Sequence, residues 1–64
     1  MIYTYTIDAE TGKDYAKRET DSYSEADRLY DYYVREGWEY VSFRKRIMNS
    51  ETMRDEFQLI KANH

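Results

Sequence analysis

A chain of 64 residues without cysteine can form only one small domain, and it can hold neither disulfides nor thiolate metal sites. Its one histidine, His64, cannot by itself supply a site with several histidine ligands, so we expect no metal. The net charge of −3 argues against a dedicated nucleic-acid-binding protein, which normally carries a basic excess.

Charge is distributed unevenly along the chain. Residues up to Glu39 include ten acids and five bases, whereas the remainder includes three acids and five bases. No segment contains the ~20 apolar residues of a membrane helix, and the N-terminal residues do not have the pattern of a secretory signal. We therefore expect a single domain over residues 1–64, located in the cytoplasm and without a membrane partner.

The first twenty residues predict a β-hairpin. Residues 2–7 are all β-branched or aromatic, which is typical of a strand. We expect residues 8–13 to form the loop, where Gly12 can take the positive φ of a tight turn. Residues 15–20 then return as a second strand, and their charges indicate a position at the edge of a sheet.

The next segment predicts an amphipathic helix. Ser24 is the expected N-cap, and Gly37 supplies the left-handed residue that ends a helix. Trp38, just beyond the helix, is expected to fold back on Tyr33. The apolar stripe has helical spacing and consists of Ala26, Leu29, Tyr30, Tyr33 and Val34.

Residues 40–48 predict a third strand, and residues 53–62 fit either a helix or a strand. Folding the chain about Ser50, so that paired residue numbers add to 100, places Phe43 opposite Phe57. The same register places Arg44 opposite Glu56 and Lys45 opposite Asp55. Such cross-strand pairs contribute roughly 0.2–1 kcal/mol each, which favours a second hairpin.

The predicted fold class is α+β with the order ββαββ: a four-stranded antiparallel sheet of two hairpins, with one helix packed on one face. Around the end of the helix, the segments Ser24-Glu25-Ala26 and Glu36-Gly37-Trp38-Glu39-Tyr40-Val41 resemble a group of small uncharacterised bacterial and phage proteins. These share a capped helix ending in Glu-Gly-Trp-Glu, a hydrophobic residue and Val. The match covers less than half of the chain. Its residues serve helix termination and packing, so the resemblance implies a fold and no activity.

Aromatic residues are the most conspicuous functional signal, with 8 tyrosines in the chain. One helix covers only one face of a sheet, so we expect the other face to keep a partly apolar patch in which Trp38 and Tyr40 lie beside Ile60. Tyrosine and tryptophan are enriched at protein interfaces. The interface candidates are Trp38, Tyr40, Ile60, Tyr3 and Tyr5.

A second hypothesis is weak nucleic-acid binding on the open sheet face by Arg44, Arg46 and Tyr40. Strand alternation points Arg44 and Arg46 to one side and Lys45 to the other, and the predicted register pairs these bases with acids. Structural pairing is therefore the favoured interpretation of this basic segment.

No nucleophile motif, phosphate-binding glycine loop or paired carboxylates are recognisable, so we expect no enzyme and no cofactor. A chain this short buries only about 60% of its unfolded surface, and self-association or a protein partner would supplement its core. The sequence thus predicts a small protein-interaction module that binds itself or a host protein. It could act as a phage-type inhibitor or regulator by occupying a partner's surface. The third alternative is a purely structural homo-oligomeric domain.

Overall fold

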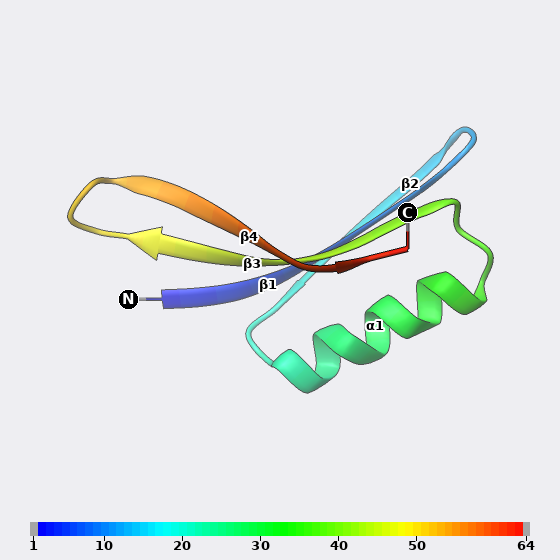
Figure 1. The fold of residues 1–64 in the computed structure, drawn as a ribbon, viewed down its shortest axis with the longest axis horizontal. Coiled ribbons are helices and arrows are strands. Elements are labelled where there is room, and N and C mark those ends of the chain that lie inside the picture. The colour runs from blue at the N-terminus through cyan, green and yellow to red at the C-terminus, as the bar shows by residue number, and fades with distance from the viewer. Residues whose placement is uncertain (1, 64) are drawn as a thin grey trace.

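The predicted fold class is confirmed. A computed structural model describes residues 2–63 as one antiparallel sheet with the strand order β2-β1-β3-β4 and one helix across one of its faces (Figure 1). The elements are β1 (Ile2–Thr11), β2 (Asp14–Thr20), α1 (Tyr23–Arg35), β3 (Tyr40–Asn49) and β4 (Arg54–Ala62). The two hairpins project from opposite ends of the sheet, as Figure 1 shows.

The first hairpin is longer than the sequence predicts. The expected loop over residues 8–13 is wrong, because β1 continues to Thr11 and the turn contains only Gly12 and Lys13. Gly12 has a φ of 48°, the positive value that two-residue hairpin turns need at their first central residue. Residues 7–10 alternate between core and solvent, so their polar members belong to a strand with one exposed face. The expected edge position of the second strand is confirmed.

The helix begins two residues earlier than predicted. Ser22 is the N-cap, and its hydroxyl accepts a hydrogen bond from the Glu25 amide at 3.3 Å, whereas Ser24 lies within the first turn. At the other end, Gly37 takes a φ of 90°. The Trp38 amide then donates to the Tyr33 carbonyl, and the Gly37 amide donates to the Val34 carbonyl. These two bonds form a Schellman motif, which confirms the predicted helix end.

The core lies between α1 and the central strands. It consists of Ile7, Ala9, Ala26, Tyr30, Tyr33, Val41 and Phe43. The rings of Tyr5, Tyr23 and Tyr30 surround Phe43 at centroid distances of 5.9, 5.3 and 6.4 Å. Leu29 packs against this core as predicted, but Val34 is exposed, because it lies at the margin of the helical stripe.

Residues 54–62 form a strand, as the hairpin prediction required, but the predicted register is wrong. The turn spans residues 50–53, with Met53 at a φ of 56°, so Arg46 lies opposite Phe57 and Arg44 opposite Leu59. Paired numbers there add to 103 instead of 100. Since this shift is odd, Phe57 and Leu59 lie on the face opposite Phe43. A bulge follows, where Ile60 is the extra residue between the partners of Phe43 and Arg44.

The helix packs against β1, β2 and β3 and leaves β4 largely uncovered. Lys61 connects β4 to the helix: its ammonium pairs with Asp27 and lies 5.0 Å from the centroid of the Tyr30 ring. The hydrogen bond that the ammonium donates to Asp27 raises the pKa of Lys61. Within residues 2–63, no helix is long and apolar enough to cross a membrane.

Candidate interaction surface

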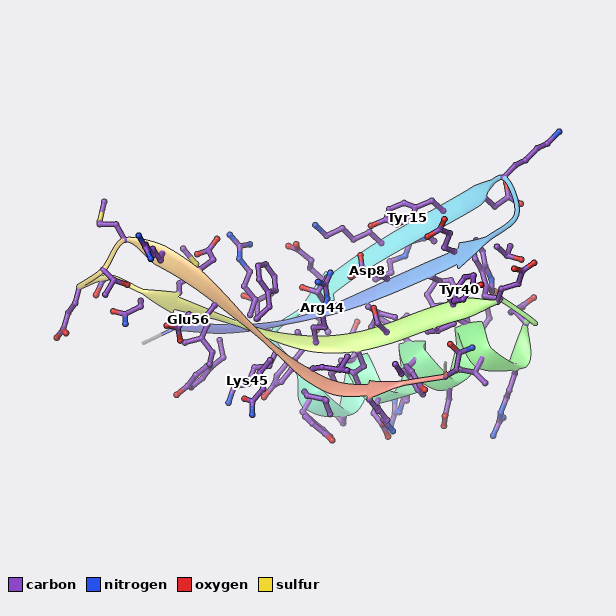
Figure 2. All side chains as sticks on the ribbon, turned by 45° about the horizontal axis from the view of Figure 1, so that its top comes forward. Asp8, Tyr15, Tyr40, Arg44, Lys45 and Glu56 are labelled. Atoms are coloured by element: carbon purple, nitrogen blue, oxygen red, sulfur yellow. The ribbon has the colours of Figure 1, made fainter. Side chains whose placement is uncertain are left out.

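The sheet face opposite α1, here called the open face, presents rows of side chains from neighbouring strands, and Figure 2 labels Asp8, Tyr15, Tyr40 and Arg44 among them. Strand pairing defines the rows, because residues directly opposite one another share a face. The rows are Tyr15–Glu10–Tyr40, Lys17–Asp8–Ser42–Ala62, Glu19–Thr6–Arg44–Leu59, Thr4–Arg46–Phe57 and Met48–Asp55. The open face therefore has aromatic or apolar side chains at both ends and charged side chains between them.

An ion pair occupies the centre of the open face. Asp8 on β1 pairs with Arg44 on β3, and the Tyr15 hydroxyl donates to Asp8 Oδ1 at 2.8 Å (Figure 2). This hydrogen bond to the carboxylate raises the pKa of Tyr15. The Arg44 guanidinium also lies 5.1 Å from the centroid of the Phe57 ring. Under these side chains Thr6 is only 1% exposed.

At one end, Glu10 lies between two tyrosines. It is directly opposite Tyr15 on β2 and Tyr40 on β3, and both rings are more than half exposed. A hollow of about 250 Å³ opens between these strands and is lined by Asp8, Ala9, Glu10, Tyr15, Tyr40 and Ser42. Within residues 2–63, Glu10 forms no ion pair, so this row combines a carboxylate with two aromatic walls.

At the other end, Phe57 and Leu59 project from β4, and Met48 projects from β3. All three are exposed. Asp55 lies beside them and accepts hydrogen bonds from Arg46, from Nη2 at 2.6 Å and from Nε at 3.2 Å. The Asp55 carboxylate at the border of this apolar end is therefore neutralised by Arg46.

The structure separates the five interface candidates. Tyr40 lies on the open face, whereas Tyr3 is exposed on the helix-side face, where the Lys45 ammonium lies 4.0 Å from its ring centroid. Trp38 and Ile60 pack against the core, so the predicted patch in which they lie beside Tyr40 is wrong, and Tyr5 also packs against the core.

Each of these three partly buried candidates has a local reason for its position. Trp38 is held by the Schellman turn and contacts the Tyr33 ring edge-on at 5.5 Å. The helix start covers Tyr5, whose ring meets Tyr23 edge-on at 5.5 Å. Ile60 lies at the bulge of β4, where strand alternation is interrupted.

Sequence reasoning missed four exposed residues of the open face. Tyr15 and Glu10 share a face only if the first strand extends to Thr11, and the polar composition of residues 8–11 concealed that extension. The predicted register places Phe57 opposite the buried Phe43, and the same shift of register conceals that Leu59 lies on the open face. Alternation counted forward from the buried Ile7 is the signal that places Glu10 on the opposite face.

The basic segment is paired within the domain, as the favoured interpretation predicts, although with different partners. Arg44 pairs with Asp8 instead of Glu56, and Arg46 pairs with Asp55. Lys45, expected opposite Asp55, lies over the Tyr3 ring instead. Hydrogen bonding to Asp55 raises the pKa of Arg46. Both arginines of the nucleic-acid hypothesis thus have carboxylate partners on neighbouring strands.

A second hollow, of about 510 Å³, lies on the outer surface of α1 and is lined by Arg28, Asp31, Tyr32, Arg35 and Glu36. Its mixed charges are those of a solvated helix face, and a hydrogen bond to Glu36 raises the pKa of Tyr32. The described part of the chain contains no group of three or more His, Cys, Asp or Glu residues placed to hold a metal ion. His64 lies outside that part.

Comparisons with protein-family models, with curated proteins and with solved structures find no match to this chain. The resemblance to small bacterial and phage proteins around the helix end therefore stays a prediction. The functional argument rests on the open face itself.

Proposed function

We propose that this chain is a non-enzymatic protein-interaction module that binds another protein through the tyrosine-rich end of its open face. The observation that carries the proposal is the amount of apolar surface the helix leaves uncovered. At the tyrosine-rich end Tyr15 and Tyr40 are 63% and 52% exposed, and at the other end of the same face Met48, Phe57 and Leu59 are between 42% and 60% exposed. Grouped exposed apolar side chains with a polar border are typical of interaction sites.

The ion pair at the centre of the open face is compatible with the proposal. The central ion pair between Asp8 and Arg44 already neutralises both charges, which reduces the cost of removing them from water.

The chemistry of the tyrosine end favours a basic group on the partner. Glu10 offers a carboxylate between the rings of Tyr15 and Tyr40, with the hollow of about 250 Å³ beside them. An arginine or lysine side chain placed there would pair with the carboxylate and lie against aromatic faces, contacts that contribute about 0.5–2 kcal/mol each. Such a module acts by occupying its partner's surface, as an inhibitor or a regulator does.

Site-specific photo-crosslinking in the native cell tests this function. A photoreactive phenylalanine analogue replaces Tyr40 on the open face or, as the control, Tyr32 on the outer face of α1. The two side chains have nearly equal exposure, 52% and 55%. We expect position 40 to crosslink a second protein that position 32 does not. If both positions give the same products, or position 40 captures only another copy of this chain, the proposal is wrong.

Charge reversal then tests the chemistry of the contact. With the crosslinked protein purified, Glu10→Lys should weaken binding at least 10-fold in calorimetry, whereas Glu36→Lys on the helix should change it less than 2-fold. Equal effects of the two variants would show that net charge, and not the tyrosine row, governs binding.

A further inference from the structure

We propose that β4 pairs antiparallel with β4 of a second copy, so that two chains form one continuous eight-stranded sheet. The proposal rests on the proposed function only in treating the chain as an interaction module, since it uses the opposite end of the open face and a different partner.

The exposure of β4 motivates the proposal. β4 is the outermost strand, residues 54–59 are all exposed, and within residues 2–63 its outer side has no strand beside it. An edge of this kind presents unpaired backbone donors and acceptors to another strand. The opposite edge, β2, carries the consecutive charges Lys17, Arg18 and Glu19 from its centre onward, and natural sheets use such charges to prevent pairing, whereas the three consecutive charges of β4 lie at its beginning. The centre of β4 is the uncharged sequence Phe57-Gln58-Leu59.

The sequence of β4 allows self-pairing in a register centred on its uncharged segment. In a continuous sheet, residues directly opposite one another point to the same face. Two copies of one strand meet this condition only if the two-fold axis passes between two copies of the same residue, on which the pairing is then centred. Centring on Asp55 or Glu56 brings two carboxylates together, which is destabilising. Centring on Phe57 places Phe57 opposite Phe57 of the second copy, Asp55 opposite Leu59, and Glu56 opposite Gln58. This register contains no like-charge pair.

The surroundings of β4 fit the same register. It uses residues 55–59, which precede the bulge at Ile60 and pair regularly with β3. The helix packs on β1, β2 and β3, so it does not obstruct the outer side of this segment. A two-fold axis perpendicular to the sheet would place both open faces on one side and unite the two apolar ends into a single patch of Phe57 and Leu59 side chains. The interface is thus isologous, as in most homodimers.

Light scattering on the purified chain, combined with one edge variant, tests the pairing. The wild type should change with concentration from the monomer mass of 7.9 kDa to twice that value. Phe57→Lys opposes two lysines at the centre of the pairing, and we expect its dimer dissociation constant to rise at least 10-fold. Tyr32→Lys, with a similarly exposed side chain on the helix, should dimerise like the wild type. A wild type that stays monomeric at about 1 mM, or an unchanged Phe57→Lys dimer, overturns the inference.

The register has its own test, because the chain contains no cysteine. Under mild oxidation, Phe57→Cys should form a disulfide-linked dimer much faster than Arg54→Cys, since position 57 faces itself and position 54 does not. Equal rates would exclude this register. The two proposals can also fail separately. A monomer that still crosslinks another protein at position 40 refutes only the dimer, and a dimer without that crosslink refutes only the proposed function.

Discussion

Truncating the two phenylalanines of the second hairpin gives a direct test of its register. Phe43 is fully buried and is surrounded by three tyrosine rings, so Phe43→Ala should destabilise the domain by about 3–5 kcal/mol. The whole domain is expected to have a stability of about 3–10 kcal/mol, so this variant will be partly or fully unfolded. Burying such a side chain fully contributes roughly 1.5–3 kcal/mol. Because Phe57 is about half exposed, Phe57→Ala should destabilise the domain by only about 1 kcal/mol.

The free energies of unfolding of both variants are measured by urea denaturation, monitored by far-UV circular dichroism and by the fluorescence of Trp38. If Phe43→Ala does not fold, Phe43→Leu provides a milder comparison, with an expected loss below about 1.5 kcal/mol. Measurements at low micromolar concentration keep any dimer contribution out of the Phe57→Ala value. A loss for Phe57→Ala as large as that for Phe43→Ala would mean that both rings are in the core, and the register described here would be refuted.

Three further predictions concern single side chains. Thr6→Val should raise the free energy of unfolding, measured by urea denaturation, by about 1 kcal/mol, because the buried Thr6 hydroxyl has no hydrogen-bond partner among the described residues. A destabilised variant would indicate a hydrogen-bond partner for this hydroxyl. Ser22→Ala should cost about 1 kcal/mol and Ser24→Ala much less, and the reverse order would restore Ser24 as the N-cap. In a spectrophotometric titration, the difference between wild type and Tyr15→Phe should show a tyrosine that ionises above the usual value of about 10, because Asp8 stabilises its neutral form. This contribution to stability is present below the pKa of the unfolded chain and is lost as the pH rises through the higher pKa of the folded state.

The sequence predicts elements that depend on local patterns. The apolar stripe of the helix and the Gly37–Trp38 termination specify both the helix and the contact with Tyr33, and the structure contains both. The β-branched and aromatic composition of residues 2–7 likewise identifies a strand. In each case the relevant neighbours lie within a few positions in the chain, so spacing alone carries the information.

Contacts between distant strands could not be predicted in the same way. Arg44 pairs with Asp8, 36 residues away, and no local pattern distinguishes that partner from Glu56 across the hairpin. The register of the hairpin depends on a four-residue turn with a left-handed Met53, a conformation that the residue type does not signal. A register that is wrong by an odd number of residues moves every side chain of a strand to the other face. For this reason the predicted register places Phe57 in the core, but it lies on the surface.

Asn63 ties the last described segment back to the middle of the chain. Its side-chain oxygen accepts a hydrogen bond from the Val41 amide at 2.7 Å, and its amide group donates to the Trp38 carbonyl at 3.2 Å. Its own backbone amide donates to the Val41 carbonyl. These hydrogen bonds join positions 22 and 25 residues apart in the chain, so the junction between α1 and β3 has its full set of hydrogen bonds only when the segment after β4 is in place.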